Sequence, residues 1–359
     1  MLLDQSLITN WLTDLFSAAN VPAEEARLIA IHLVDADASG HPSHGIVRVP
    51  RYFEYLEQNM VRPKCDFATI MESGPLLLID GKFSFGQVLG HHMIAESKRL
   101  IDEHGIALIG LRQSGHLGRI GAWAELLADK HYISLHFVNV AGSAIVAPFG
   151  AKEARLSTAP IAIGVPHFND DGSSDHFIHD FATSLVAEGK ILVSQKTGST
   201  LPANAMVDET GSDSATPATI YGATADDNVP NPSAGTGAIQ TFGGHKGSGL
   251  GIACELLAGA LTGTGTNATS RPFCNGMLSV IFDPNQFDTN SALTAEIADY
   301  IAAIRNAEPR SKDGSVFIPG DKERQRRAII AQDGVPLDEV IINQLIALSD
   351  QFSVKHPLR

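Results

Sequence analysis

One stretch in the first third of the chain combines a strand, a glycine-rich loop and a helix, and this combination constrains the fold most. Residues 105–111 (GIALIGL) are a compact apolar run typical of a β-strand, residues 112–121 (RQSGHLGRIG) form the loop, and AWAELLADK follows with helical spacing. Other strand-like runs lie at 76–80, 132–140 and 277–284, and helical patterns lie at 4–36, 46–60, 86–104, 250–263, 291–306 and 336–352. Alternating strands and helices predict an α/β fold.

Residues 196–241 do not follow this alternation. They are rich in Gly, Pro, Ser, Thr and Asp, and they are too long for an ordinary connection. We therefore expect turns, hairpin pieces and an active-site cover in this segment.

The composition excludes several classes of protein. Hydrophobic residues make up 44% of the 359 residues, which excludes intrinsic disorder and suits about two domains. The 26 Lys and Arg against 40 Asp and Glu give a net charge of −14 without a long basic run, so neither a nucleic acid nor an anionic membrane is an expected partner. The N-terminal residues lack the basic segment of a secretory signal, and the longest apolar run, 250–261, contains Glu255. These features predict a cytoplasmic protein.

Motifs of several common enzyme classes are missing. The chain has no GxGxxG between a strand and a helix, no phosphate-binding GxxxxGK[ST], no GxSxG and no HExxH. Because GxGxxG is missing, a Rossmann fold of the usual kind is not predicted.

Cys65, Cys254 and Cys274 lie far apart in the sequence, so we expect no disulfide framework. No histidine pair has a third metal-ligating residue at a suitable spacing, so we expect no metal.

The segment 40–52 (GHPSHGIVRVPRY) combines Ser43, His44 and Arg48. A histidine can donate a proton to a carbonyl oxygen as the oxygen becomes an alkoxide, and an arginine can hold a carboxylate through two hydrogen bonds. A 2-oxo acid reductase needs both groups. If a helix begins at His44, both side chains project from one face of it. The alternative interpretation is a capping loop with a solvated arginine.

Two glycine-rich loops precede helices. Residues 114–127 carry His116 and Arg119 among glycines, and residues 242–263 carry His245 and Lys246. Glycines allow close backbone approach, and a helix N-terminus attracts phosphate, so either loop could hold the anionic part of a nucleotide. Tight turns packed by glycines explain the pattern equally well.

Two further segments hold candidate residues. Asp180 in IHDFATS could orient a histidine or contact a ribose hydroxyl, or it could cap the helix that follows. Residues 318–323 (IPGDKE) have the composition of a turn with mixed charges.

Together these five segments resemble the type-2 malate/L-lactate dehydrogenase family. The family signatures GHxSHGxxRxPxY, a glycine-flanked histidine before a helix, DxATSxxAxGK, GGxKGxGL with ELLxGALTG, and PGE find counterparts here in order, from about residue 5 to 350. The counterparts are GHPSHGIVRVPRY, GHLGRIGAWAE, DFATSLVAEGK, GGHKGSGLGIACELLAGALTG and PGDKE. The resemblance implies a mixed-sheet α/β fold distinct from the Rossmann fold, with helical N- and C-terminal segments, which explains the missing GxGxxG.

The resemblance also implies the roles of particular residues. His44 is the expected acid/base residue, with Asp180 orienting it and His116 as second choice, and Ser43 and Arg48 are expected to bind the substrate. The residues expected to bind NAD or NADP are His44, Gly118, Arg119, Ile120, Ile178, His179, Asp180, Phe181, Ala182, His245, Lys246, Asn275, Gly320, Asp321, Lys322 and Glu323. Asp321 stands where the family often has Glu, which would shorten a ribose contact.

The family implies an organisation and an activity as well. We expect helical terminal segments formed by residues 1–45 with 320–359, a smaller α/β domain at 46–124 and a larger cofactor-binding α/β domain at 125–319. Family members resemble one another in forming homodimers that close the site, and the terminal helices could supply the contact.

The resemblance also implies the reaction. We expect hydride transfer between NAD(P) and a small 2-hydroxy or 2-oxo acid.

The substrate is open at this point. FSFGQVLGHH, GRIGAWAE and ISLHFVNVAG are similar to the hydroxycarboxylate dehydrogenase branch, whose substrates include aryl pyruvates. The alternatives are a malate, lactate or ureidoglycolate dehydrogenase, a reductase of cyclic imine carboxylates, and a non-catalytic nucleotide-binding protein. Residues 205–240 match the family poorly, so the sequence leaves the choice between NAD and NADP open.

Overall fold

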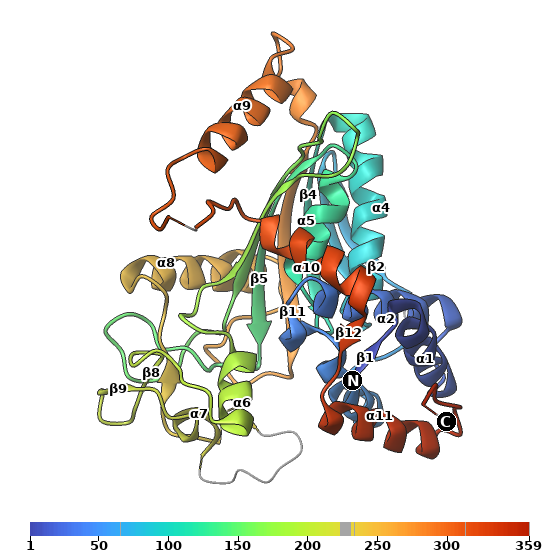
Figure 1. Cartoon of the computed structure of the whole chain (residues 1–359), viewed down its shortest axis with the longest axis vertical. Coiled ribbons are helices and arrows are strands. Elements are labelled where there is room, and N and C mark those ends of the chain that lie inside the picture. Colours follow the sequence, from blue (N-terminus) through green and yellow to red (C-terminus); the bar gives the residue numbers. More distant parts are fainter. Residues whose placement is uncertain (65, 223–230, 233, 313, 359) are drawn as a thin grey trace.

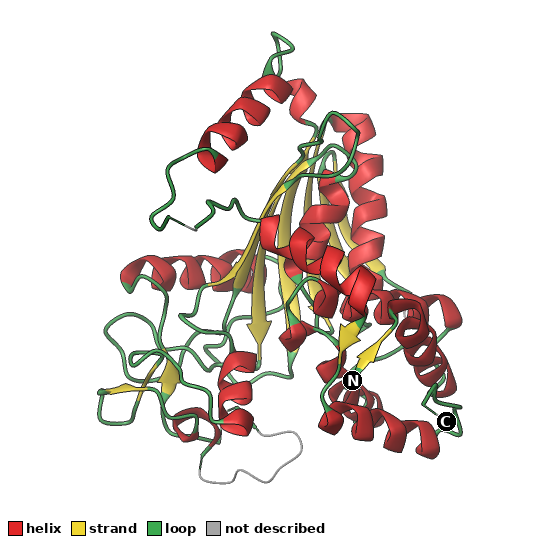
Figure 2. Ribbon diagram, in the orientation of Figure 1, coloured by secondary structure: helices red, strands yellow, loops and turns green. Residues whose placement is uncertain are grey.

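A seven-stranded mixed sheet forms the centre of the molecule (Figures 1 and 2). The computed structural model describes residues 1–64, 66–222, 231–232, 234–312 and 314–358. Only β3 (Leu76–Asp80) and β4 (Ile106–Ser114) are parallel, and the other neighbours in the sheet are antiparallel. The strand order across the sheet is β2 (Ala68–Ser73), β3 (Leu76–Asp80), β4 (Ile106–Ser114), β11 (Cys274–Phe282), β5 (Ile133–Ala141), β6 (Pro160–Val165) and β7 (Phe177–Ala182). The predicted α/β fold with a mixed sheet is confirmed.

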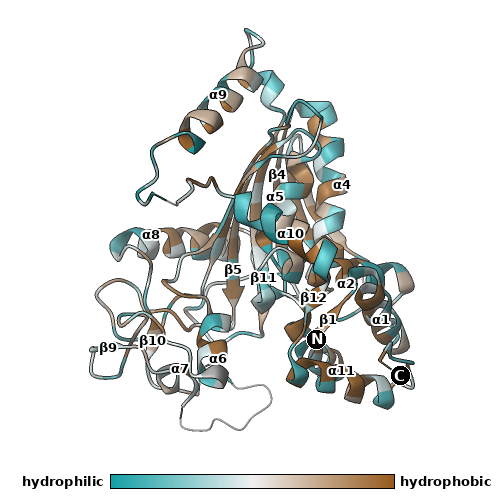
Figure 3. Cartoon of the chain, in the orientation of Figure 1, coloured by the Kyte–Doolittle hydropathy of each residue, from teal (hydrophilic) through white to brown (hydrophobic). Residues whose placement is uncertain are grey.

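Helices cover both faces of this sheet. The helices α4 (Gly86–His104) and α5 (Ile120–Ala128) pack on one face, where Leu100 and Trp123 join a core with Ile109 of β4. On the other face α8 (His245–Cys254) continues into a π-helical turn, Glu255–Ala260, that packs on β5 and β11. Figure 3 shows many hydrophobic residues in the central strands and mixed hydropathy in the surrounding helices. The helix predicted at 250–263 thus begins earlier, at His245.

The two ends of the chain share a separate core. The helices α1 (Gln5–Ala18), α2 (Ala23–Ala38), α3 (Val49–Glu57) and α11 (Glu339–Gln351) pack together through buried apolar side chains. The short strands β1 (Leu2–Leu3) and β12 (Val335–Pro336) pair beside them, and α10 (Asp321–Asp333) packs on α2. Both termini lie beside these helices (Figure 1).

The helix α10 begins within the segment that the sequence predicted as a turn, 318–323. Its sequence, DKERQRRAIIAQD, contains few apolar residues, and only Asp321 and Ile330 are buried. It therefore lacks the apolar stripe by which an amphipathic helix is found.

The described part of the segment 196–241, without residues 223–230 and 233, folds into small elements around a third core. The strands β8 (Met206–Val207), β9 (Asp213–Ser214) and β10 (Ala238–Ile239) form a small antiparallel sheet. The helix α6 (Glu188–Thr197) precedes this sheet in the chain, and α7 (Ala218–Tyr221) lies between β9 and β10. The 3₁₀ turn Pro284–Gln286 and the helix α9 (Leu293–Arg305) follow β11 in the chain, and Ile301 is the buried residue of α9.

Strands from both predicted α/β domains join the central sheet, and the domain boundaries stay a prediction. Within the described part of the chain, no helix is long and apolar enough to cross a membrane.

Candidate active site

Two short 3₁₀ turns, Pro42–His44 and Ile46–Arg48, connect α2 to α3 and carry the predicted substrate residues. The α-helix itself starts only at Val49, so His44 and Arg48 do not share one α-helical face. Asp37 of α2 fixes the junction between the turns, because its Oδ2 accepts a hydrogen bond of 2.6 Å from the Ile46 N–H. A Cβ at Gly45 would lie 2.0 Å from the same oxygen, so this position requires glycine. Burial raises the pKa of Asp37 to about 7.

His44 and His116 meet although 72 positions separate them in the sequence. The Nδ1 atom of His44 lies 3.3 Å from the Nε2 atom of His116, and the two rings stack with centroids 5.4 Å apart. The Tyr52 hydroxyl of α3 lies 2.7 Å from the Nδ1 atom of His116, and Gln87 of α4 donates an amide N–H to this hydroxyl at 2.8 Å. Sequence reasoning proposed both histidines and missed Tyr52 and Gln87.

One assignment of the proton positions in the neutral histidines satisfies all of these contacts. Because the Gln87 N–H donates to the Tyr52 oxygen, the single O–H of Tyr52 is available to donate to the Nδ1 atom of His116. His116 then carries its proton on Nε2 and donates it to the Nδ1 atom of His44. His44 is left with its proton on Nε2, the nitrogen that faces away from His116.

Both histidines are neutral at ordinary pH. Burial, with the nearby Arg48 charge as a second cause, lowers the pKa of His44 to about 3. The same two causes hold the pKa of His116 well below its usual value. A group that neutralises Arg48 would therefore raise both pKa values and make the pair easier to protonate.

Arg48 lies beside this pair and makes two contacts of its own. Its Nε–H donates to the Ser43 carbonyl oxygen at 2.5 Å, and its Nη2 atom lies 3.5 Å from the Oε2 atom of Glu188, the first residue of α6. The Tyr221 O–H donates to the other Glu188 oxygen at 2.6 Å. No signal in the sequence pointed to Glu188 or Tyr221.

A hollow of ≈ 310 Å³ brings together two predicted cofactor segments that are far apart in the sequence. Its walls come from the edge strand β7 and from the chain leading into α10, and the lining residues are Ile178, His179, Asp180, Phe317, Ile318, Pro319, Gly320, Lys322 and Glu323. Gly320 precedes α10 with a φ of 103°, a value that favours glycine. The hollow therefore combines a helix N-terminus, carboxylates, a lysine and an aromatic ring.

The hollow adjoins the segment that carries His44. The Glu323 carboxylate lies 3.2 Å from the Nε2 atom of His41, three residues before His44. Asp321 is not among the lining residues, because Arg305 and Arg324 both bind its carboxylate.

Asp180 faces α5. Its Oδ2 atom accepts a hydrogen bond of 2.7 Å from the Gly121 N–H, and burial raises the pKa of the Asp180 carboxyl. Among the described residues no hydrogen bond joins Asp180 to either His44 or His116. The alternative interpretation as an N-cap is wrong, because Asp180 lies inside β7 and the next helix begins at Glu188.

Arg119 is buried, with a side chain that is 1% exposed. Its guanidinium pairs with Asp35 at 3.0 Å and with Glu125, and Arg327 of α10 binds the same two carboxylates. The backbone N–H of Arg119 donates to the Nε2 atom of His32 at 3.0 Å. The arginine of this loop thus joins α2, α5 and α10 and does not line the hollow.

Asn275 holds the loop that carries His116. Its Oδ1 atom accepts a hydrogen bond of 2.9 Å from the Leu117 N–H, and its Nδ2 donates to the Asn139 carbonyl oxygen. Gly118 of the same loop has a φ of 73° and packs so closely on His32 that a Cβ would lie 2.1 Å from the ring. Ile120, another residue predicted to bind the cofactor, is the first residue of α5, and its side chain is buried in the core between α5 and the sheet.

The other predicted cofactor residues are placed as follows. Phe181 stacks on His179 with centroids 4.4 Å apart, and Ala182 ends β7. His245 and Lys246 are exposed at the start of α8, where the His245 ring approaches Phe149.

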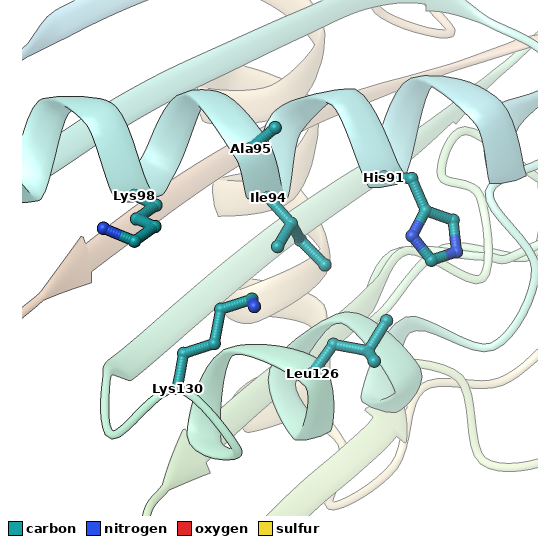
Figure 4. Close-up of a pocket in the computed structure, with 6 residues that line it drawn as sticks. All are labelled: His91, Ile94, Ala95, Lys98, Leu126 and Lys130. Atoms are coloured by element: carbon teal, nitrogen blue, oxygen red, sulfur yellow. The ribbon is translucent and has the colours of Figure 1, made fainter.

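A second hollow lies between α4 and α5, lined by His91, Ile94, Ala95, Lys98, Leu126 and Lys130 (Figure 4). It contains none of the residues predicted to bind substrate or cofactor. The described residues include no group of three metal-ligating side chains arranged to hold an ion.

Comparison with known proteins decides the family. The sequence model of the malate/L-lactate dehydrogenase family matches residues 3–346. The chain belongs to this family. It is 32% identical to hydroxycarboxylate dehydrogenase B of Escherichia coli strain K12, with 93% of this chain and 90% of that protein covered. It is 31% identical to the L-lactate dehydrogenase of Cupriavidus necator, with 96% of each covered.

A solved member of the malate/L-lactate dehydrogenase family has the same fold. The sulfolactate dehydrogenase of Methanocaldococcus jannaschii superimposes with a TM-score of 0.84 at 29% identity, covering 99% of this chain and 98% of that chain. Membership of the family confirms the predicted family, fold and enzyme class, an oxidoreductase of the dehydrogenase type. The roles of the individual site residues remain predictions.

Proposed function

We propose that this member of the malate/L-lactate dehydrogenase family transfers a hydride between a pyridine nucleotide and C2 of a 2-hydroxy or 2-oxo carboxylic acid. The observation that carries the proposal is the hydrogen-bonded His44–His116 pair beside Arg48. A proton-transferring group and a carboxylate-binding group in one site are the two side-chain functions that this reaction needs. The named activities of the relatives, on hydroxycarboxylates and L-lactate, support the same chemistry.

Each residue of the site has a proposed role in reduction. Arg48 binds the substrate carboxylate, and this neutralises the charge that is, after burial, the second cause of the lowered pKa of His44 and His116. The pair then takes up one proton, and His44 delivers it from Nε2 to the substrate oxygen as negative charge develops there. In oxidation the same atom removes the proton. Tyr52 and Gln87 hold His116, and through it His44, in position.

The hollow between β7 and α10 fits part of a pyridine nucleotide. The backbone N–H groups at the start of α10 suit a pyrophosphate, the Asp180 and Glu323 carboxylates suit ribose hydroxyls, and the Phe317 ring suits the flat face of a base. When bound, the nicotinamide ring supplies or accepts the hydride. Parallel assays with NADH and NADPH test which of the two nucleotides the protein uses.

The decisive experiment is a reduction assay that follows loss of NADH or NADPH absorbance. The acceptor panel holds pyruvate, oxaloacetate, 2-oxoglutarate, phenylpyruvate, hydroxyphenylpyruvate and pyrroline-2-carboxylate. We expect turnover of 2-oxo acids, with aryl pyruvates supporting the hydroxycarboxylate dehydrogenase branch. Turnover of the cyclic imine alone would move the reaction to a C=N bond, and cofactor binding without any turnover would support a non-catalytic protein.

Substitution of the two histidines tests their roles. His44→Ala should lower kcat by about 10²–10⁴-fold, the usual contribution of a general acid, while nucleotide binding measured by calorimetry survives. His104→Ala, an exposed histidine at the end of α4, is the control and should retain full activity. If His116→Ala abolishes turnover while His44→Ala does not, His116 is the acid.

We further propose that the protein acts as a homodimer in the cytoplasm. The faces of α1, α2, α3 and α11 are largely used in their own core, whereas Ile252, Leu256 and Leu261 along α8 and the turn after it are 44%, 56% and 63% exposed. A second copy covering this apolar stripe would border His245 and Lys246. Sedimentation of Leu256→Glu should show monomers where the unchanged protein forms dimers, and cell fractionation tests the location.

A further inference from the structure

We infer that Glu188 makes this site selective for 2-oxo acids that carry one negative charge, against dicarboxylic acids. The inference rests on the proposed function, in which Arg48 binds the substrate carboxylate. It concerns a position that the family signature DxATSxxAxGK leaves variable, between Ala187 and Gly189.

The Glu188 carboxylate already contacts Arg48, the residue proposed to bind the substrate carboxylate. Its Oε2 atom lies 3.5 Å from the Nη2 atom of Arg48, and both side chains are partly buried, at 18% and 28% exposed. The Nε–H of Arg48 is used by the Ser43 carbonyl oxygen, so a substrate carboxylate must share the remaining N–H groups with Glu188.

Two contacts prevent Glu188 from moving away freely. The Tyr221 O–H holds the Oε1 atom at 2.6 Å, and Tyr221 itself is 1% exposed. The start of α6 also packs on the substrate segment, since a Cβ at Gly189 would lie 2.4 Å from the Ser43 Cβ. The negative charge is therefore a fixed part of the site.

The charge balance around Arg48 favours a single substrate charge. The neighbouring Arg51 pairs with Glu54 at 3.0 Å, so its charge is also partly neutralised. The first carboxylate of a substrate is attracted by Arg48 and repelled by Glu188. A second negative group on the substrate adds a further repulsion by Glu188 without a further attraction by Arg48. Like charges in a partly buried site repel more strongly than in water, so dicarboxylates lose affinity.

A simpler role for Glu188 predicts a different result. An acidic first residue stabilises a helix through the helix dipole, and Glu188 is the first residue of α6. In that case, its removal would lower thermal stability and leave the preference between substrates unchanged.

The test is the ratio of kcat/KM for oxaloacetate to that for pyruvate, measured in Glu188→Gln. We expect the ratio to rise by about tenfold or more, which corresponds to about 1.4 kcal/mol in transition-state binding. The control Glu54→Gln makes the same charge change at the partner of Arg51, and we expect its ratio to match that of the unchanged protein. Phenylpyruvate and 2-oxoglutarate serve as a second pair of acceptors.

Other outcomes separate the inference from the proposed function. An unchanged ratio in folded Glu188→Gln, or an unchanged protein that prefers oxaloacetate, overturns the selectivity and leaves the proposed function standing. If Glu188→Gln does not fold, Tyr221→Phe keeps the charge and removes only the O–H that holds it, and an unchanged ratio there overturns the inference. No turnover of any acceptor with either nucleotide overturns both.

Discussion

The two glycine-rich loops look alike in the sequence and differ in the structure. Each carries a histidine and a basic residue just before a helix, at His116 and Arg119 in one and at His245 and Lys246 in the other. In the first loop, Arg119 is buried among carboxylates; in the second, Lys246 is exposed at the start of α8.

The backbone of the two loops differs in the same way. In the first loop, N–H groups donate to side chains from three other parts of the chain, His32, Asp180 and Asn275. In the second loop, the N–H groups of residues 246–248 donate to carbonyl oxygens of the same turn. The first loop is thus part of the framework that holds His116, whereas the second leaves His245 and Lys246 exposed to solvent. The following predictions test this difference.

The largest expected effect comes from removing the buried arginine. Arg119→Met leaves Asp35 and Glu125 with Arg327 alone, and breaking a buried charge network of this kind costs about 3–5 kcal/mol. Urea denaturation should show this loss, while the matched substitution Lys246→Met should change the free energy of unfolding by less than about 0.5 kcal/mol. A stable Arg119→Met protein that fails to bind nucleotide would contradict this, because Arg119 would then serve nucleotide binding and not the stability of the fold.

The next effect concerns the side chain that anchors the first loop. Asn275→Ala removes the acceptor of the buried Leu117 N–H, which should cost about 1–3 kcal/mol of stability. Because Leu117 follows His116, kcat should fall together with stability. Asn285→Ala, at an exposed asparagine, should change neither quantity; an unchanged kcat in Asn275→Ala would show that the loop keeps its position without this anchor.

A smaller, pH-dependent effect is expected at Asp180. Burial raises the pKa of this carboxyl, so the folded protein binds a proton that the unfolded chain has lost. The Asp180 contribution to stability is therefore present below the unfolded pKa of about 3.9 and is lost as pH rises through the higher folded value.

Asp180→Asn keeps an acceptor for the Gly121 N–H and removes the ionisation. Between pH 4 and 8 the variant should gain stability relative to the unchanged protein, by at most about 1.4 kcal/mol per pH unit. Thermal denaturation over this range measures the gain. A difference that stays constant with pH would mean that the carboxyl has an ordinary pKa.

The smallest effect should appear at the second loop. Lys246→Met should raise the KM for the nucleotide about fivefold, as expected for one exposed ion pair of about 1 kcal/mol, without changing kcat. Lys130→Met, at the other hollow, is the control and should leave the nucleotide KM unchanged. An unchanged KM in Lys246→Met would remove the second loop from the cofactor site.

The comparison also shows how far sequence reasoning reaches. Apolar periodicity located α4 with its exact bounds, and the motif order identified the family, because both signals are local. Whether Arg119 faces a ligand depends on Asp35, Glu125 and Arg327, which lie in other helices and which nothing in the loop itself indicates. Two segments of the cofactor hollow were predicted from their motifs, yet their meeting depends on α10, whose polar sequence gave no helical signal.

The Tyr52 and Glu188 contacts were missed for a related reason. Tyr52 stands inside the substrate motif, but its role becomes visible only once His116 is brought to it from 64 positions away. Glu188 belongs to the first turn of a helix, where an acidic residue is ordinary, and only the neighbouring Arg48 gives it a special meaning.

The position of β11 has a consequence for how the chain is synthesised. This strand enters the sheet between β4 and β5, although both of those strands leave the ribosome long before it. At a synthesis rate of about 5–20 residues per second, β11 follows β5 on the order of ten seconds or more later. During this time one edge of β4 and one edge of β5 stay unpaired. Asn275 belongs to the same strand, so its hydrogen bond with the Leu117 N–H in the His116 loop forms only after β11 has been synthesised. We therefore expect the newborn protein to depend on chaperones that shield strand edges, and the enzyme to become active only after synthesis has passed β11.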